Sequence, residues 1–100
     1  MTEAELNLSL AKALFPDCTI KPPVHEKDSV LLSGGGKGIT IFNYRNWNDL
    51  MPHVIEHGIE LLLEQGQWVA CWGEPVQIED NDPQRALAKC LLAVMKKSPD

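Results

Sequence analysis

The stretch IELLLEQGQWVACW, residues 59–72, decides the fold that we predict for this chain. Gln65-Gly66 favours a tight turn, so the residues on either side of it predict a β-hairpin. The runs Leu61–Leu63 and Trp68–Trp72 are almost continuously apolar, whereas a sheet with one face in water would alternate apolar and polar residues. We therefore expect these two strands to be covered on both faces.

A second hairpin is predicted earlier in the chain. Ser29–Leu32 and Ile39–Tyr44 are short runs rich in β-branched or aromatic residues, and they flank the glycine-rich stretch SGGGKG, residues 33–38. The segments Cys18–Asp28 and Gly73–Asn81 are predicted to be loops, because prolines interrupt both of them.

Three predicted helices surround these hairpins. Thr2–Phe15 begins with Thr2 and Glu5 at the spacing of a capping box, and Asp49–His57 ends just before Gly58, a residue suited to a helix C-terminus. Asp82-Pro83 opens the last helix, with aspartate as the N-cap and proline in the first helical position.

The predicted element order is α-β-β-α-β-β-α. Four strands predict one antiparallel sheet, and three helices are enough to cover both of its faces. The predicted fold class is therefore α+β, a four-stranded antiparallel sheet between helices, or α/β/α sandwich. We expect a single domain over residues 1–97, followed by a C-terminal tail at residues 98–100.

Composition narrows the range of functions. The chain has 100 residues, of which 44% are hydrophobic and 23% charged, as in an ordinary globular domain, and its net charge is −5. Because an acidic chain lacks the positive surface that binds phosphate backbones, we do not expect a nucleic-acid partner. The first residues, MTEAELNLSLAKALF, carry acids where a signal peptide carries cations, so we expect a cytoplasmic protein with no membrane partner. The three cysteines are far apart, and no cofactor is predicted.

The glycine-rich loop invites comparison with phosphate-binding loops. A P-loop requires Ser or Thr after Gly-Lys and a helix behind the loop, but here Gly38 follows Lys37 and the run ITIFNY predicts a strand. We therefore interpret SGGGKG as a hairpin loop that needs positive φ angles. A weak anion site formed by Gly35, Gly36 and Lys37 stays open as an alternative.

The stretch HVIEH, residues 53–57, matches the H-x-x-E-H pattern of one class of zinc proteases. His53 and His57 lie one helical turn apart and are able to share a metal ion. However, the predicted helix ends one residue later, and the sequence marks no third ligand. We interpret the two histidines as surface residues, and a weak metal site at His53 and His57 stays open.

Two surfaces are candidates for protein contact. The first helix has a second apolar side, which predicts either a self-association surface or burial beneath the loop that follows. The last helix carries cations around one leucine, which predicts either a solvated basic face or a contact with a protein or nucleic-acid partner. The candidate interface residues are Leu8, Ala11 and Phe15 on the first helix, and Arg85, Lys89 and Leu92 on the last.

Several stretches resemble small bacteriophage and prophage proteins. These are ELNLSLAKAL (5–14), WNDLMPHVIEHGIELLL (47–63) with WVACW (68–72), and DNDPQRALAKCLLAVMKK (80–97). The chain resembles the phage ABA sandwich family and the similar NinX-type phage proteins, including their closing P-x-R-A helix. The resemblance implies an α/β/α fold and an accessory role for a phage or prophage in a bacterial cytoplasm, and it implies no catalytic residues.

We accordingly predict a non-enzymatic protein-binding module that self-associates as a homo-oligomer and binds a further protein, for instance one from the host. One alternative is a small metal-dependent enzyme that uses His53 and His57. Another is an acidic mimic of nucleic acid that occupies a host DNA-binding protein, which the net charge of −5 favours.

Overall fold

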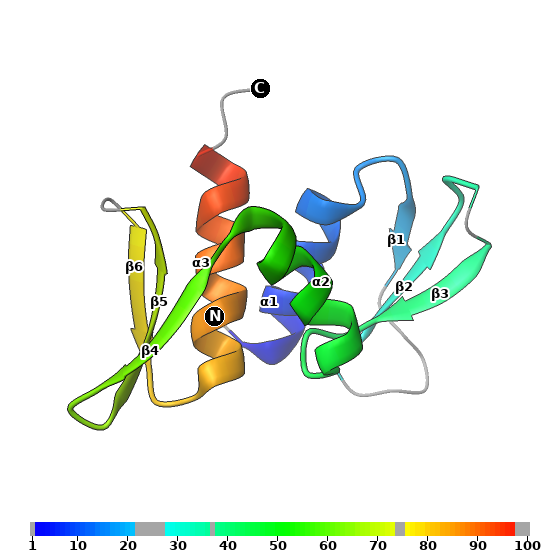
Figure 1. Cartoon of the computed structure of the whole chain (residues 1–100). Coiled ribbons are helices and arrows are strands. Elements are labelled where there is room, and N and C mark those ends of the chain that lie inside the picture. Colours follow the sequence, from blue (N-terminus) through cyan, green and yellow to red (C-terminus); the bar gives the residue numbers. More distant parts are fainter. Residues whose placement is uncertain (1, 22–27, 37, 74–75, 98–100) are drawn as a thin grey trace. The chain divides into compact units, whose positions relative to one another are not determined.

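The computed structural model describes residues 2–21, 28–36, 38–73 and 76–97, and it divides the chain into two compact units, Met1–Tyr44 and Arg45–Asp100. Each unit contains one three-stranded antiparallel sheet, and the element order is α-βββ-α-βββ-α (Figure 1). The first unit contains α1 (Glu3–Leu14), β1 (Thr19–Lys21), β2 (Val30–Ser33) and β3 (Ile39–Phe42). The second contains α2 (Trp47–His57), β4 (Glu60–Glu64), β5 (Gln67–Trp72), β6 (Val76–Asp80) and α3 (Pro83–Lys97).

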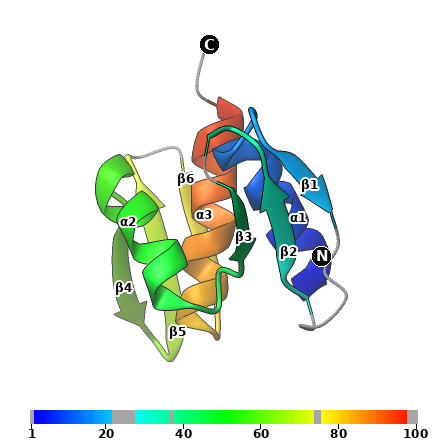
Figure 2. The same cartoon turned by 90° about the vertical axis from the view of Figure 1, so that its right-hand side faces the viewer.

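In the first unit, α1 lies against β1 and β2 (Figure 2). The predicted capping box is confirmed: Glu5 N donates to Thr2 Oγ1 at 3.1 Å, and Thr2 N donates to Glu5 Oε1 at 2.8 Å. Strands β1, β2 and β3 pair in that order, so β2 is central and β3 forms an edge. Val30 and Leu32 of β2 are buried, which identifies the sheet face that the helix covers.

A buried asparagine links this helix to the chain around the sheet. Asn7 is fully buried, and its Nδ2 donates to Asn43 Oδ1 at 3.1 Å and also to the carbonyl oxygen of Asp28. Its Oδ1 accepts the N–H of Tyr44 at 2.8 Å. Because all three bonds stay within the first unit, Asn7 fixes the register of α1 against the segments that bracket β2 and β3.

In the second unit, α3 packs against β5 and β6, and α2 packs against α3. The register pairs Ala70 with Ile78 and Trp72 with Val76, so these four residues share one sheet face. Ala70 and Val76 are buried, which makes this the inner face. Trp72 Nε1 also donates to the carbonyl oxygen of His57 at 2.8 Å and thereby joins β5 to the end of α2.

The prediction of one four-stranded sheet is wrong, because two predicted loops each contain a further strand. Thr19–Lys21 lies within the predicted loop Cys18–Asp28, and Val76–Asp80 lies within the predicted loop Gly73–Asn81. The second of these, VQIED, alternates in burial as an amphipathic strand does. Pro75 in the sequence favoured a loop, but strands tolerate a proline before their first residue, and this strand begins at Val76.

The two predicted hairpins and three predicted helices are confirmed within the described residues. Gly58 ends α2 with φ 71°, the left-handed conformation predicted for that position. The expectation that the strands of residues 59–72 are covered on both faces is wrong for β4, where Leu62 and Leu63 are 48% and 59% exposed. The single domain expected over residues 1–97 stays a prediction.

Candidate functional site

The glycine-rich loop joins two strands, as predicted, and no helix begins behind it. Gly34, Gly35, Gly36 and Gly38 all have positive φ angles, which confirms the interpretation of a turn that demands glycine. At Gly35 a side chain would also meet Cys18 Sγ at 3.1 Å. Lys37, the cation of the alternative anion site with Gly35 and Gly36, lies outside the described residues.

The histidines of HVIEH lie in the last turns of α2, as predicted. His57 Nδ1 lies 2.9 Å from the carbonyl oxygen of His53, and His53 Nδ1 lies 3.9 Å from Glu56 Oε1. Within the described ranges, the His, Cys, Asp and Glu side chains form no group of three that fits a metal ion. The metal site at His53 and His57 stays an untested alternative.

The candidate residues of the first helix are buried or partly buried. Ala11 is fully buried, and the ring of Phe15 meets the ring of Phe42 edge to face, with centroids 5.7 Å apart. Leu8 is half-buried. Among the residues that the structure describes, no large apolar side chain of α1 is strongly exposed. The geometry therefore favours the alternative that the second apolar side of this helix belongs to the core.

The cations predicted on the last helix are bound by Asp80 of β6. Lys89 Nζ lies 2.7 Å from Asp80 Oδ2, and Arg85 Nε lies 3.6 Å from the same oxygen. Burial by itself raises the pKa of Asp80, but the hydrogen bonds from Lys89 and from the N–H of Asp82, together with the two cations, hold the pKa below its ordinary value of 3.8. The basic face is thus largely neutralised within the chain.

The prediction of an exposed Leu92 among these cations is wrong. Leu92 is buried, and so are residues on most sides of α3. The buried residues of α3 are Ala86, Leu87, Ala88, Cys90, Leu91, Leu92 and Val94. At its N-terminus, Asp82 Oδ1 accepts the N–H of Gln84 at 2.9 Å, which confirms the predicted cap.

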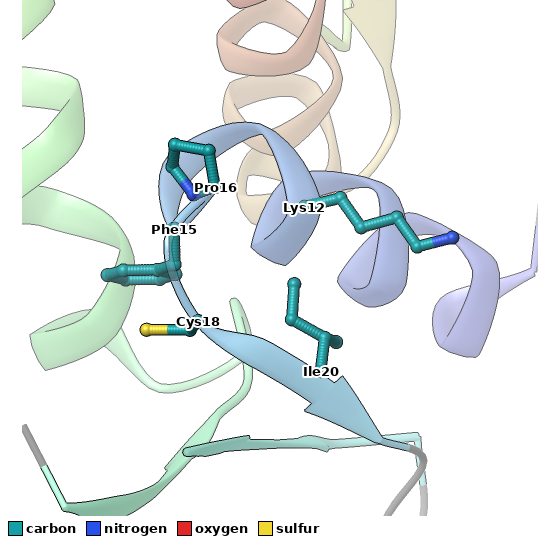
Figure 3. Close-up of a pocket in the computed structure, with 5 residues that line it drawn as sticks. All are labelled: Lys12, Phe15, Pro16, Cys18 and Ile20. Carbon is teal, nitrogen blue, oxygen red and sulfur yellow. The ribbon is translucent and has the colours of Figure 1, made fainter. Parts of the chain in front are cut away.

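A hollow of about 230 Å³ lies where α1 meets β1 (Figure 3). Its lining residues are Lys12, Phe15, Pro16, Cys18 and Ile20. The ammonium group of Lys12 points away from the sulfur of Cys18, so the thiol has no base beside it in this hollow. The volume is also smaller than the roughly 300–1,000 Å³ of ordinary ligand pockets. The hollow therefore offers neither a nucleophile pair nor room for a typical ligand.

Among the described residues of the first unit, the most exposed large apolar side chains lie on the outer surface of β3. Ile39 and Ile41 point to the same side of the sheet, and the two residues are 76% and 46% exposed, respectively. Thr40 between them is also exposed, although it points to the opposite face of the strand, the one that carries the buried Phe42. We call Ile39, Thr40 and Ile41 the β3 surface. Sequence reasoning found the strand but missed this surface, because it assumed that helices cover both faces of the sheet.

Comparisons of the chain with protein-family models, with curated proteins and with solved structures give no match. In the part of the chain that the structure describes, none of the helices has the length and apolar character of a membrane span.

Proposed function

We propose that this chain is a non-enzymatic protein-binding module that self-associates through the β3 surface. The observation that carries the proposal is an edge strand with two exposed isoleucines, Ile39 and Ile41, and no charged side chain over residues 39–42. Edge strands of this kind pair readily with other strands unless charges or prolines protect them. The proposed accessory role for a phage or prophage in a bacterial cytoplasm is supported by the sequence resemblance.

The β3 sequence is complementary to itself. When two copies pair antiparallel about a two-fold axis at Thr40, Ile39 of each copy lies opposite Ile41 of the other. All four isoleucines then lie on one face of a joined six-stranded sheet. Leu31, which pairs with Ile41 in the register of the single chain, extends this apolar surface onto β2. Such β-branched cross-strand pairs stabilise sheets.

The expected affinity is low. The exposed surfaces of Ile39 and Ile41 together slightly exceed one whole isoleucine, which is worth about 2–3 kcal/mol per copy on burial. New backbone hydrogen bonds contribute about 1 kcal/mol each, and association costs at least about 4 kcal/mol. The net free energy of dimerisation then corresponds to a dissociation constant of roughly 0.1–1 mM.

Sedimentation velocity over about 10 µM to 2 mM protein tests this proposal. The wild-type chain should shift from monomer towards dimer across this range. The variant Ile39→Lys, Ile41→Lys should stay monomeric, because the pairing would place like charges opposite each other. These side chains are exposed in the single chain, so the substitutions should leave the fold intact.

A matched control uses Ile55 of α2, which is 72% exposed but lies on a helix. Ile55→Lys should leave the concentration dependence unchanged. A wild-type chain that stays monomeric at the highest concentration contradicts the proposal. Equal dimerisation of the wild type and the β3 variant would show that self-association uses another surface.

A further inference from the structure

Strand β4 is an edge strand of the sheet in the other unit. The sheet order β4-β5-β6 leaves one side of β4 unpaired among the described strands (Figure 1). Leu62 and Leu63 are 48% and 59% exposed and point to opposite faces of this strand. The backbone N–H and C=O groups along the unpaired edge of β4 are therefore able to pair with an added strand. The apolar side chains on the two faces of β4 would pack against the side chains of that strand.

Glutamates flank the apolar centre of β4. Glu60 and Glu64 are exposed and lie on the same, outer face as Leu62, on which Glu79 of β6 is also exposed. The remaining residues of the strands on that face are uncharged: Gln67, Val69, Cys71 and Gln77. The outer face of this sheet thus carries three carboxylates and no cation of its own strands.

An open hollow of about 510 Å³ extends from the Glu64 end of β4 across the sheet towards Glu79 of β6. It is lined by Glu64, Gln65, Gln67 and Glu79, so it combines two carboxylates with two amides. The hollow has room for a long cationic side chain, and its lining supplies acceptors for one. The charge pattern of the edge and the lining of the hollow therefore favour the same kind of group.

A second copy of this chain is a poor occupant of this edge. Antiparallel pairing of two β4 strands centred on Leu62 places Glu60 of each copy opposite Glu64 of the other. Like charges directly opposite each other destabilise a strand pair, and inserted charges are a common protection of edge strands against self-pairing. The same glutamates attract a strand whose charges are positive at the corresponding positions.

We infer that β4 binds an extended segment of a partner protein that is apolar in its middle and basic on both sides. The segment adds an antiparallel strand to β4, with an apolar residue opposite Leu62 and a Lys or Arg opposite each of Glu60 and Glu64. Glu79 of β6 adds a further negative charge to the outer face of the same sheet. This inference goes beyond self-association and does not depend on it, because the β3 surface belongs to the other unit.

A fluorescence-anisotropy titration of the whole chain tests the inference. The probe is a labelled, end-blocked peptide with the sequence Ser-Lys-Val-Ile-Val-Lys-Ser, and its comparison replaces both lysines with glutamates. The lysine peptide should bind at least about tenfold more tightly than the glutamate peptide, since two cross-strand charge pairs change from attractive to repulsive. The neutral variant Ile39→Thr, Ile41→Thr should bind the lysine peptide as tightly as the wild type does. Peptide binding to β4 is therefore tested separately from self-association through the β3 surface.

Charge reversal on the protein locates the site. Glu64→Lys should weaken binding of the lysine peptide about tenfold, whereas Glu56→Lys should change it less than about twofold. Glu56 is exposed on α2, so both variants alter the net charge equally. The inference is overturned if the lysine peptide fails to bind at about 1 mM, if both peptides bind alike, or if both variants weaken binding alike.

Discussion

Replacing Asp80 with asparagine should destabilise the second unit by about 2 kcal/mol at pH 7. The charge-assisted bond from Lys89 at 2.7 Å is worth about 1.5–3 kcal/mol when it is buried, and the Asp80 side chain is only 10% exposed. Lys89 itself is 33% exposed, so water compensates for part of the hydrogen bond that the substitution removes. The lower end of that energy range therefore applies. Arg85, at 3.6 Å, adds a few tenths of a kcal/mol.

The pH dependence of this loss identifies its cause. Because the native pKa of Asp80 is lowered below 3.8, the carboxylate contributes stability that is fully present above that value. The contribution is lost as the pH falls from 3.8 through the lowered native pKa. The wild type and Asp80→Asn should therefore differ by about 2 kcal/mol at pH 7 and converge in strongly acidic solution.

Urea unfolding followed by tryptophan fluorescence measures this difference. All three tryptophans, Trp47, Trp68 and Trp72, lie in the second unit with Asp80. Glu79→Gln is the matched control: Glu79 is exposed on the other face of the same strand, so the change should stay within about 0.5 kcal/mol. A loss below about 0.5 kcal/mol for Asp80→Asn, or an equal loss at pH 7 and pH 3, would refute the pairing and return Lys89 to the candidates for partner binding.

Two further predictions concern buried groups. Asn7→Leu should destabilise the first unit by about 3 kcal/mol, because it removes three hydrogen bonds, including the one that Asn7 accepts from the Tyr44 N–H. Thermal unfolding followed by circular dichroism measures this loss, and an unchanged midpoint contradicts the prediction. Cys90 should react far more slowly than Cys18 with a thiol reagent at pH 8. Burial, with a smaller effect of Cys71, raises the pKa of Cys90 from 9.0 to about 11, which lowers its thiolate fraction about a hundredfold; equal rates for the two cysteines contradict this prediction.

Local signals predicted the helices and the two hairpins well. Thr2, Gly58 and Asp82 each occupy the capping role expected of them, because such roles depend on residues within one turn of the helix end. The two missed strands, β1 and β6, pair with strands that are close in the sequence, Lys21 with Leu31 and Val76 with Trp72, so local features account for their omission. Strand β1 has only three residues, too few for a period to be read, whereas the alternation of β6 was present in the sequence and was outweighed by Pro75.

The missed strand β6 also explains why the last helix was misinterpreted. Arg85 and Lys89 suggested a basic surface because their acidic partner, Asp80, was assigned to a loop. Once Val76–Asp80 is a strand packed against α3, its final carboxylate lies beside both cations. Charge on a helix face is therefore informative about binding only after the residues that pack beside that helix are known.

The edge strands β3 and β4 differ in their protection against strand pairing, and this difference supports two separate contacts. Strand β4 places a glutamate at each end of its apolar centre, which penalises pairing with itself, whereas β3 carries no charge between Ile39 and Phe42. If both edges were merely surface, the same protection would serve both. An unprotected β3 is consistent with pairing between identical strands, and a protected β4 is consistent with selection of a strand of opposite charge.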